Sequence, residues 1–255
     1  MLFHVAKVKC CEPVLLIAST LWRKLLAEYL GSMLLAAMVI GSGIAAQQLS
    51  PHALGLELLE NAAATGAGLF VLIATIGPIS GAHFNPVISF VDAAFGGISW
   101  RTAASYLAAQ VAGCTSGAVL ANLMFSRSAI SLSTDHRATA AHGLSELVAT
   151  AGLVLVIFAL ARAKRSSLAP AVVGAYIASA YFFTSSTSFA NPAIVVARMF
   201  SNSFAGIAPT SAPFFVVAEV VGGVVGFGLV KALYPGLTPR DASRVTDALI
   251  DGGAR

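Results

Sequence analysis

Residues 80–87 read Ser-Gly-Ala-His-Phe-Asn-Pro-Val, and residues 188–193 read Ser-Phe-Ala-Asn-Pro-Ala. In both stretches an Asn-Pro pair opens a short apolar segment, over about residues 85–95 and 191–201. Asn is a strong helix N-cap, and Pro fits the first helical turn, where its missing N–H would have no partner anyway. Apolar segments of this length are typical of re-entrant segments. The two stretches therefore predict two half-helices, each capped at its N-terminus.

The rest of the chain has the composition of an integral membrane protein. Of its 255 residues, 57% are hydrophobic and only 10% are charged, whereas a soluble domain carries roughly 25% charged residues. The same composition excludes a disordered chain, because so many apolar residues can bury ample surface. Six further apolar stretches are long enough to cross the hydrocarbon core of a bilayer, which is roughly 30 Å thick. They cover about residues 25–46, 62–80, 101–124, 143–161, 168–187 and 213–233.

The chain repeats itself, with three spanning stretches in each half. Glu28 lies in the first span and Glu146 in the fourth, and each is followed by one Asn-Pro segment. Gln110 in the third span corresponds to Glu219 in the sixth, where we expect a hydrogen bond between packed helices. Because each half contains three spans, an odd number, the second half starts on the opposite membrane face, and the repeats are inverted. In such folds binding or conduction takes place at the midplane, where the broken helices meet.

The basic residues predict the orientation of the chain. With the N-terminus inside, the cytoplasmic side receives Lys7, Lys9, Arg23, Lys24, Arg101, Arg162, Lys164, Arg165, Lys231, Arg240, Arg244 and Arg255. Only Arg127, Arg137 and Arg198 fall outside, which is a strong positive-inside bias. The net charge of +4 therefore reflects topology and not a nucleic-acid interface.

This orientation places both termini in the cytoplasm and divides the chain into three parts. We expect a cytoplasmic N-terminal extension, a channel domain and a cytoplasmic C-terminal tail. They cover residues 1–22, 23–234 and 235–255, with the two repeats at about 23–125 and 142–234.

The sequence does not point to an enzyme or to a cofactor. Cys114 lies in an apolar stretch and is expected to be a small packing residue. The adjacent Cys10 and Cys11 lack the wider spacing and additional ligands of a metal site. We find no paired acid and base, metal cluster or phosphate-binding loop. We therefore predict no catalytic residues, no metal and no cofactor.

The two half-helices predict a pore that excludes charge. Each helix N-terminus carries roughly half a positive charge, so two of them meeting at mid-membrane repel cations. The amides of Asn85 and Asn191 can still donate hydrogen bonds to a neutral solute. A coupled secondary transporter is the alternative, but coupling needs titratable or ion-coordinating groups at the midplane. The broken helices offer two asparagines there and no carboxylate, which favours a passive channel for small uncharged solutes.

The residues that carry this argument resemble those of the aquaporin or major intrinsic protein family. The matching motifs are Asn85-Pro86-Val87 and Asn191-Pro192-Ala193, together with Glu28 and Glu146. The resemblance covers about residues 23–234 and implies an all-α membrane protein with six tilted spans and two re-entrant half-helices. It also implies one pore per chain, a homotetramer and a place in the cell (inner) membrane.

The same resemblance implies roles for particular residues. The two glutamates Glu28 and Glu146 would bond the loop backbone beside the half-helices, which satisfies polar groups that lipid cannot satisfy. Backbone carbonyls would line the pore at Gly81, Ala82, His83, Ser186, Thr187 and Ser188.

Two positions depart from the family pattern. Val87 replaces the alanine of the first motif, and we expect its extra methyl groups to pack where the half-helices abut. Ile194 stands directly after the second motif, where aquaporins commonly place the arginine of the filter. The nearest arginine is Arg198, one helical turn or about 5.4 Å further on and on the same helix face. Arg198 can therefore still face the pore; alternatively, it leaves the pore for lipid headgroups or a loop carboxylate.

The remaining filter positions predict a wide constriction. Counting from the motifs gives Thr65, Ser179 and Ser188, which with Ile194 are all small or uncharged. The pattern Asn-Pro-Ala-x-x-x-Ala-Arg followed by Phe-Ala-Gly-Ile, here residues 191–198 and 204–207, is similar to bacterial aquaglyceroporins associated with arsenic resistance. The implied solutes are glycerol-like polyols or arsenous acid, together with water. A water-selective aquaporin is the alternative.

Overall fold

The computed structural model describes residues 20–235, and within that range the chain is helical and has no strand. The expectations for the cysteines Cys10 and Cys11, for most of the N-terminal extension and for the tail beyond residue 235 lie outside the described residues. The helices are α1 (Leu21–Leu49), α2 (Leu54–Ser80), α3 (Pro86–Phe95), α4 (Trp100–Met124), α5 (Ala140–Arg162), η1 (Ser166–Leu168), α6 (Ala169–Phe183), α7 (Pro192–Arg198) and α8 (Ala212–Leu233).

Six helical stretches of the described chain are long and apolar enough to cross a membrane, which confirms the predicted spans. They are α1, α2, α4, α5, α6 with the short η1 before it, and α8. The fifth span ends at Phe183 and not near residue 187, because Thr184 already has an extended backbone. The last of the two half-helices, α7, likewise ends at Arg198, before the predicted residue 201.

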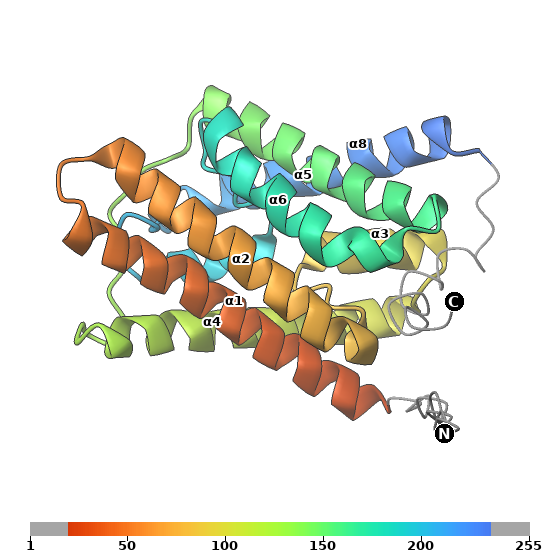
Figure 1. Cartoon of the computed structure of the whole chain (residues 1–255), viewed down its shortest axis with the longest axis horizontal. Helices are drawn as coiled ribbons and strands as arrows, with labels where there is room; N and C mark the ends of the chain where they lie inside the picture. Colours follow the sequence, from red (N-terminus) through yellow and green to blue (C-terminus); the bar gives the residue numbers. More distant parts are fainter. Residues whose placement is uncertain (1–19, 236–255) are drawn as a thin grey trace, which may run out of the picture.

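The helices pack as two inverted halves. α1 lies along α4, α5 lies along α8, and α2 crosses α6, so the first and third spans of each half are neighbours. In Figure 1 the beginning of α1 and the end of α8 lie at the same, right-hand end of the molecule. Each half thus contributes one layer, and the two layers meet through α2, α6 and the half-helices.

Small residues allow the neighbouring spans to approach closely. Gly113 and Gly117 of α4 lie against α1, and an added Cβ would overlap the carbonyl oxygens of α1. Gly222 and Gly226 occupy the matching places on α8 and lie against α5. Such spacing of small residues is a common means of helix association in membranes. It keeps both layers thin enough for the half-helices to reach the interior.

The two half-helices begin near the centre of the bundle and point away from each other. Asn85 and Asn191 have extended backbones and cap α3 and α7, and a proline follows at the first helical position in both. Val87 is buried, and its side chain lies against Gly223 of α8. A larger side chain at Gly223 would overlap Val87, so the absence of a side chain at Gly223 provides the space that Val87 occupies.

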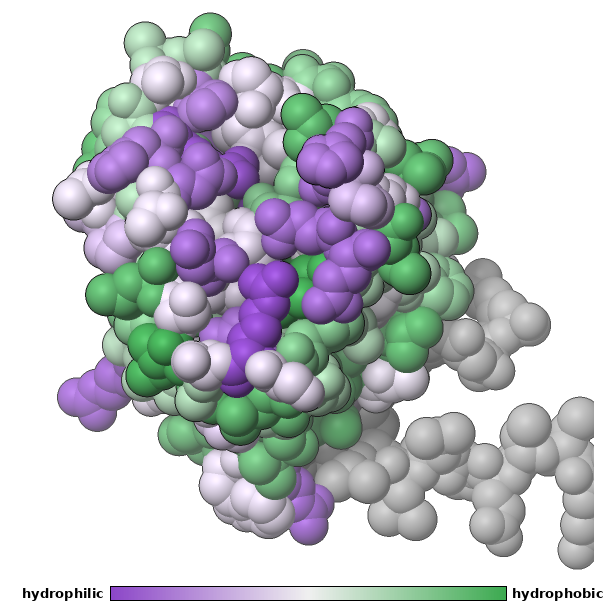
Figure 2. Space-filling view, turned by 90° about the vertical axis from the view of Figure 1, so that its left-hand side faces the viewer, coloured by the Kyte–Doolittle hydropathy of each residue, from purple (hydrophilic) through white to green (hydrophobic). Residues whose placement is uncertain are grey.

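One end face of the bundle is markedly more polar than its sides. Figure 2 shows hydrophilic side chains gathered across the centre of this face, with apolar side chains around its edge. The face carries the end of α1 with the α1–α2 connection, and the α4–α5 connection (Figure 1). Exposed polar residues there include Gln47 and Gln48 in the last turn of α1, and Ser128 and Thr134 after α4. A polar end and apolar sides are what a membrane-spanning bundle presents to water and to lipid.

Candidate solute pathway

The loops that precede α3 and α7 have the same backbone conformation. In both, the residues four, three and one positions before the asparagine have a positive φ. The φ angles are 91° at Gly81, 50° at Ala82 and 49° at Phe84, and 65° at Thr187, 48° at Ser188 and 47° at Ala190. A non-glycine residue in this left-handed region costs about 1–3 kcal/mol and persists only where the surroundings impose it. The inverted repeat therefore extends to single backbone angles.

In the first half, buried Glu28 supplies much of this constraint. Its carboxylate accepts hydrogen bonds from the backbone N–H groups of His83, at 3.0 Å, and Phe84, at 2.7 Å. It also accepts from Ser80 Oγ at 2.6 Å and from Gln110 Nε2 at 2.8 Å. Two loop N–H groups that cannot join a helix thus find an acceptor inside the membrane.

Glu146 holds the second loop in the same way. Its carboxylate accepts from the backbone N–H groups of Phe189, at 2.9 Å, and Ala190, at 2.7 Å. These residues stand two and one positions before the asparagine, as His83 and Phe84 do in the first half. Glu219, the counterpart of Gln110, accepts from the backbone N–H of Asn191 at 2.8 Å and interacts with Glu146 of α5.

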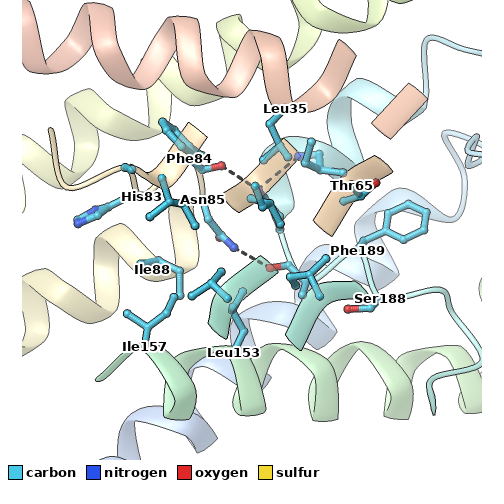
Figure 3. A pocket seen from close by; sticks show the side chains of 18 of the residues that line it. Leu35, Thr65, His83, Phe84, Asn85, Ile88, Leu153, Ile157, Ser188 and Phe189 are labelled. Carbon is cyan, nitrogen blue, oxygen red and sulfur yellow. Dashed lines mark hydrogen bonds between the residues drawn. The ribbon is translucent and has the colours of Figure 1, made fainter. Parts of the chain in front are cut away.

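The two asparagine side chains connect the loops to each other. Asn85 Nδ2 donates to the carbonyl of Ala190 at 2.7 Å, and Asn191 Nδ2 donates to the carbonyl of Phe84 at 2.8 Å; Figure 3 marks both bonds. Each Oδ1 accepts from the second residue of its own half-helix, Val87 or Ala193. An amide NH₂ has two hydrogens, so each asparagine keeps one hydrogen for a further partner.

A cavity runs past both asparagines. In Figure 3, Thr65, Ser188 and Phe189 lie on one side of Asn85, while His83, Ile88 and Ile157 lie on the other. Most of the wall is apolar, with contributions from α1, α2, α5 and α6. The lining includes Leu35, Val39, Thr65, Leu69, Ile73, Gly81, Ala82, His83, Phe84, Asn85, Ile88, Asp92, Leu153, Ile157, Phe158, Ala169, Val173, Ile177, Tyr181, Ser188, Phe189, Ala190, Asn191, Ile194 and Arg198.

Of the five predicted filter residues, four lie on this wall, Arg198 among them, and one does not. Thr65, Ser188 and Ile194 line the cavity. Ser179 does not, because it is exposed on the outer side of α6, where its hydroxyl donates to the carbonyl of Tyr176 at 2.8 Å. The assignment of Ser179 to the constriction is therefore wrong.

Tyr181 takes the place that Ser179 was expected to fill. Two residues along a helix turn a side chain through about 200°, so Tyr181 faces the cavity where Ser179 faces outward. Its hydroxyl lies 3.1 Å from Thr65 Oγ1. The four-residue spacing of Val173, Ile177 and Tyr181, all on the wall, is the sequence signal that identifies this face. With Tyr181 and Phe189 present, the constriction is not free of aromatic side chains, contrary to expectation.

Arg198 faces the cavity and not the lipid. Its side chain is buried, with the residue only 1% exposed, and its guanidinium carbon lies 3.4 Å from the centroid of the Phe189 ring. Its Nε donates to the carbonyl of Ala205. Buried in this way, the side chain does not reach the lipid-facing surface of the bundle. Arg137 stands 5.6 Å from the same ring and pairs with Asp135 at 2.6 Å.

Of the residues predicted to line the pore with their backbone carbonyls, some lie on the cavity wall and others do not. Gly81, Ala82 and His83 lie on the cavity wall, whereas Ser186 and Thr187 do not. Ser186 is fully buried behind the loop, where its hydroxyl accepts a hydrogen bond from the backbone N–H of Ser188 at 3.2 Å. The corresponding part of the second wall is made by Ser188, Phe189 and Ala190.

Comparison with known proteins agrees with this geometry. The family model for the major intrinsic protein family matches residues 16–190. The chain is 48% identical to the aquaglyceroporin AqpS of Rhizobium meliloti (strain 1021) over 213 residues, which are 84% of this chain and 91% of that one. It is 30% identical to the probable aquaporin TIP2-2 of Oryza sativa subsp. japonica over 214 residues, 77% of this chain and 81% of the relative.

A solved structure shares the fold. The X-ray structure of the aquaglyceroporin from Plasmodium falciparum matches with a TM-score of 0.67 at 21% identity, covering 86% of this chain and 98% of the other. The family match spans more than half of the chain, and the structural match covers all but its margins. This chain is a member of the major intrinsic protein family and forms a channel for small neutral solutes.

Proposed function

We propose that this channel conducts glycerol-sized polyols and related uncharged hydroxylated solutes, arsenous acid among them, passively and together with water. The observation that carries the proposal is the crossed pair of asparagine amides in a largely apolar cavity. Asn85 and Asn191 each spend one amide hydrogen on the opposite loop and keep one for a solute oxygen. A polyol can direct its oxygens toward these donors and its carbon chain toward the apolar wall.

The exclusion of ions follows from the same meeting point. α3 and α7 direct their N-termini toward each other, and their partial positive charges add where the two loops meet. A cation at this place would lose its water and face two repelling dipoles, whereas a neutral hydroxyl group needs only hydrogen bonds. Arg198 adds a fixed positive charge on the same wall.

The size of the solute is argued from Ile194. It stands where aquaporins commonly carry the filter arginine, and the arginine of this chain follows one turn later and lies against Phe189. Moving the guanidinium off the usual position leaves more width beside Ile194 for a solute larger than water. The name aquaglyceroporin given to the relative AqpS is in keeping with this solute class.

A water-selective channel is the second candidate, and one observation favours it. Tyr181 and Phe189 place two aromatic rings beside the cavity at the level of Thr65 and Arg198. Aromatic side chains at a constriction reduce its width. The two candidates differ in one measurable quantity, the ratio of glycerol permeability to water permeability.

We further infer that the chain forms a homotetramer in the cell's inner membrane with both termini cytoplasmic. The channel domain is assigned to residues 23–234. Arg23, Arg101, Arg162 and Lys231 stand at helix ends that share one end of the bundle, as the positive-inside rule requires of a cytoplasmic side.

Stopped-flow light scattering on proteoliposomes tests the proposed function. Vesicles that contain the channel should take up glycerol at least about tenfold faster than protein-free vesicles of the same lipid, because passage avoids the hydrocarbon barrier. Uptake should neither saturate with rising glycerol concentration nor require an ion gradient. Vesicles that pass water rapidly and glycerol at the lipid rate would establish the water-selective candidate instead.

A further inference from the structure

One acidic side chain on the cavity wall takes no part in the contacts described above. Asp92 lies on α3, seven residues or about 10 Å along the half-helix from the asparagine that caps it. The residue is only 1% exposed, and among the described residues neither carboxylate oxygen receives a hydrogen bond. Its neighbours along the wall include the apolar side chains of Ile88, Ile157 and Phe158.

The position of Asp92 is unfavourable for a residue with a purely structural role. A buried carboxylate without a hydrogen-bond partner costs free energy that an apolar side chain would not. Asp92 also lies in the last turn of α3, where the helix dipole disfavours a negative charge. Space is nevertheless kept for it, because a Cβ at Gly97 would overlap its carboxylate.

His83 lies next to the Asp92 carboxylate, and a contact with Ser89 positions its imidazole ring. Its Nδ1 lies 3.1 Å from Ser89 Oγ, which donates to the carbonyl of Asn85 at 3.1 Å and accepts from Gln110 Nε2 at 3.0 Å. We assign the single hydroxyl hydrogen of Ser89 to the carbonyl of Asn85, and with this assignment His83 Nδ1 donates to Ser89. His83 Nε2 is then an acceptor, 3.6 Å from Asp92 Oδ2 and too far for a hydrogen bond between them.

We propose that Asp92 and His83 Nε2 form a hydroxyl-binding site in the half of the pathway that α3 lines. The site rests on the proposed function, which it deepens by naming how the solute is recognised. Two adjacent acceptors can take the hydrogens of two neighbouring hydroxyl groups on one solute. They complement the midplane, where Asn85 and Asn191 donate to solute oxygens.

The pair of sites selects a chemical class. As it passes, a solute uses oxygen acceptors at the midplane and then at least two hydroxyl donors at the second site, about 10 Å further along α3. Neutral polyols and undissociated polyhydroxy acids meet both conditions. The site lowers the free energy of such solutes in a stretch whose wall is otherwise apolar. Water depends on the site less, because each water molecule in the pathway can also bond to the next one.

Two substitutions of Asp92 test the proposal in proteoliposomes. Asp92→Leu keeps the branched shape of the side chain and removes both acceptors, and Asp92→Asn keeps one acceptor oxygen. We expect Asp92→Leu to lower glycerol permeability about tenfold, in line with the loss of a hydrogen bond to a charged group. Asp92→Asn should fall between this variant and the natural protein. Water permeability should stay within about twofold in both.

A matched control and a competition experiment make the test specific. Glu60→Leu removes a carboxylate that lies outside the cavity wall, where it accepts from Ser50 Oγ, and should leave the ratio of glycerol to water permeability unchanged. Glycerol present on both sides of the membrane should slow water flow in the natural channel and slow it less in Asp92→Leu. Thermal unfolding in detergent identifies any variant that fails to fold, in which case Asp92→Asn carries the comparison.

Three outcomes overturn the proposal. Glycerol permeability that is unchanged or raised in folded Asp92→Leu would show that the carboxylate does not bind the solute. An equal loss of water and glycerol permeability would assign Asp92 to the shape of the pore. A natural channel that carries water and no glycerol would overturn the polyol specificity itself, and the hydroxyl-binding site with it.

Discussion

Ile194 occupies the position at which a single side chain has most influence on the width of the pathway. It is 4% exposed and lies on the cavity wall three residues after Asn191. Ile194→Arg should restore a guanidinium at the usual filter position and reduce glycerol permeability about tenfold, while water permeability falls less. This magnitude corresponds to about 1.4 kcal/mol of added barrier.

Stopped-flow measurement of both solutes checks this expectation. Ile194→Leu conserves volume and polarity and serves as the control, with glycerol permeability expected to stay close to that of the natural channel. Equal losses of glycerol and water in Ile194→Arg would mean that Ile194 is not at the constriction.

Arg198 is a second residue whose single side chain affects what passes, and it acts on ions through its charge. It is buried, stacked on Phe189 and bonded to the carbonyl of Ala205, so its guanidinium is a fixed positive charge beside the pathway. Arg198→Ala should raise the leak of monovalent cations at least about twofold, because a charge in a low-dielectric wall acts strongly on a passing ion.

The leak is measured with an ion-sensitive dye trapped in proteoliposomes. Arg127→Ala is the matched control. Arg127 lies on the α4–α5 connection at the polar end face of the bundle, where it donates to the carbonyl of Asn202 at 3.0 Å. If neither variant leaks, the exclusion of cations depends on the half-helices alone.

At the scale of elements, the carboxylates that hold the loops are the most sensitive points. Glu146 uses one oxygen for the N–H of Phe189 and the other for the N–H of Ala190. Glu146→Gln replaces one oxygen by a donor, which leaves one buried N–H without an acceptor. We expect the free energy of unfolding to fall by about 1–3 kcal/mol.

Chemical or thermal unfolding in detergent micelles measures this loss. Glu60→Gln is the control: Glu60 lies near the beginning of α2, where it accepts from Ser50 Oγ, away from both loops. A stability of Glu146→Gln equal to that of the natural protein would show that the second loop does not need this carboxylate.

The contact between spans gives a second prediction for the elements. Gly222→Val should destabilise the channel by about 1–3 kcal/mol, the usual cost of forcing bulk into a packed site, because an added side chain would overlap the backbone of α5. Gly228→Val, on the same helix, has no atom within 4 Å of the added Cβ and should have little effect. Melting temperatures of the two purified variants provide the measurement, and similar values would contradict the close approach of α5 and α8.

The elements could be predicted because their signals are local. Length and apolar composition identify the six spans, and an Asn-Pro pair before a short apolar run identifies both half-helices. The end of α6 was placed too late, because residues 184–187 are apolar or small enough to continue a helix. The helix stops there because the loop backbone is held by Glu146, 37 residues before the end of α6, which no local pattern reveals.

Single site residues were predicted less well than elements. Ser179 was assigned by counting along the sequence, but a helix face is decided by periodicity, and that periodicity selects Tyr181. The stacking of Arg198 on Phe189 depends on how the connection after α7 returns to the wall. Asp92 could have been noticed as an acid inside a short apolar segment, but its lack of a partner is a tertiary property.

For the whole molecule, the orientation in the membrane is directly testable. Ser128 is exposed on the α4–α5 connection, and Arg165 is exposed on the α5–α6 connection at the opposite end of the bundle. With the three natural cysteines replaced by alanine, a membrane-impermeant maleimide should label Ser128→Cys in intact cells. It should label Arg165→Cys only after the cells are opened, and the reverse pattern would contradict the orientation that the basic residues predict.

The crossed amide bonds also have a consequence for biogenesis. Until the second half of the chain has been synthesised, the side chain of Asn85 lacks the carbonyl of Ala190, and the carbonyl of Phe84 lacks the amide of Asn191. A ribosome-bound nascent chain that ends before α7 thus contains a first loop with unsatisfied polar groups in lipid. Closure of the conduit is consequently a late step that follows synthesis of the second half.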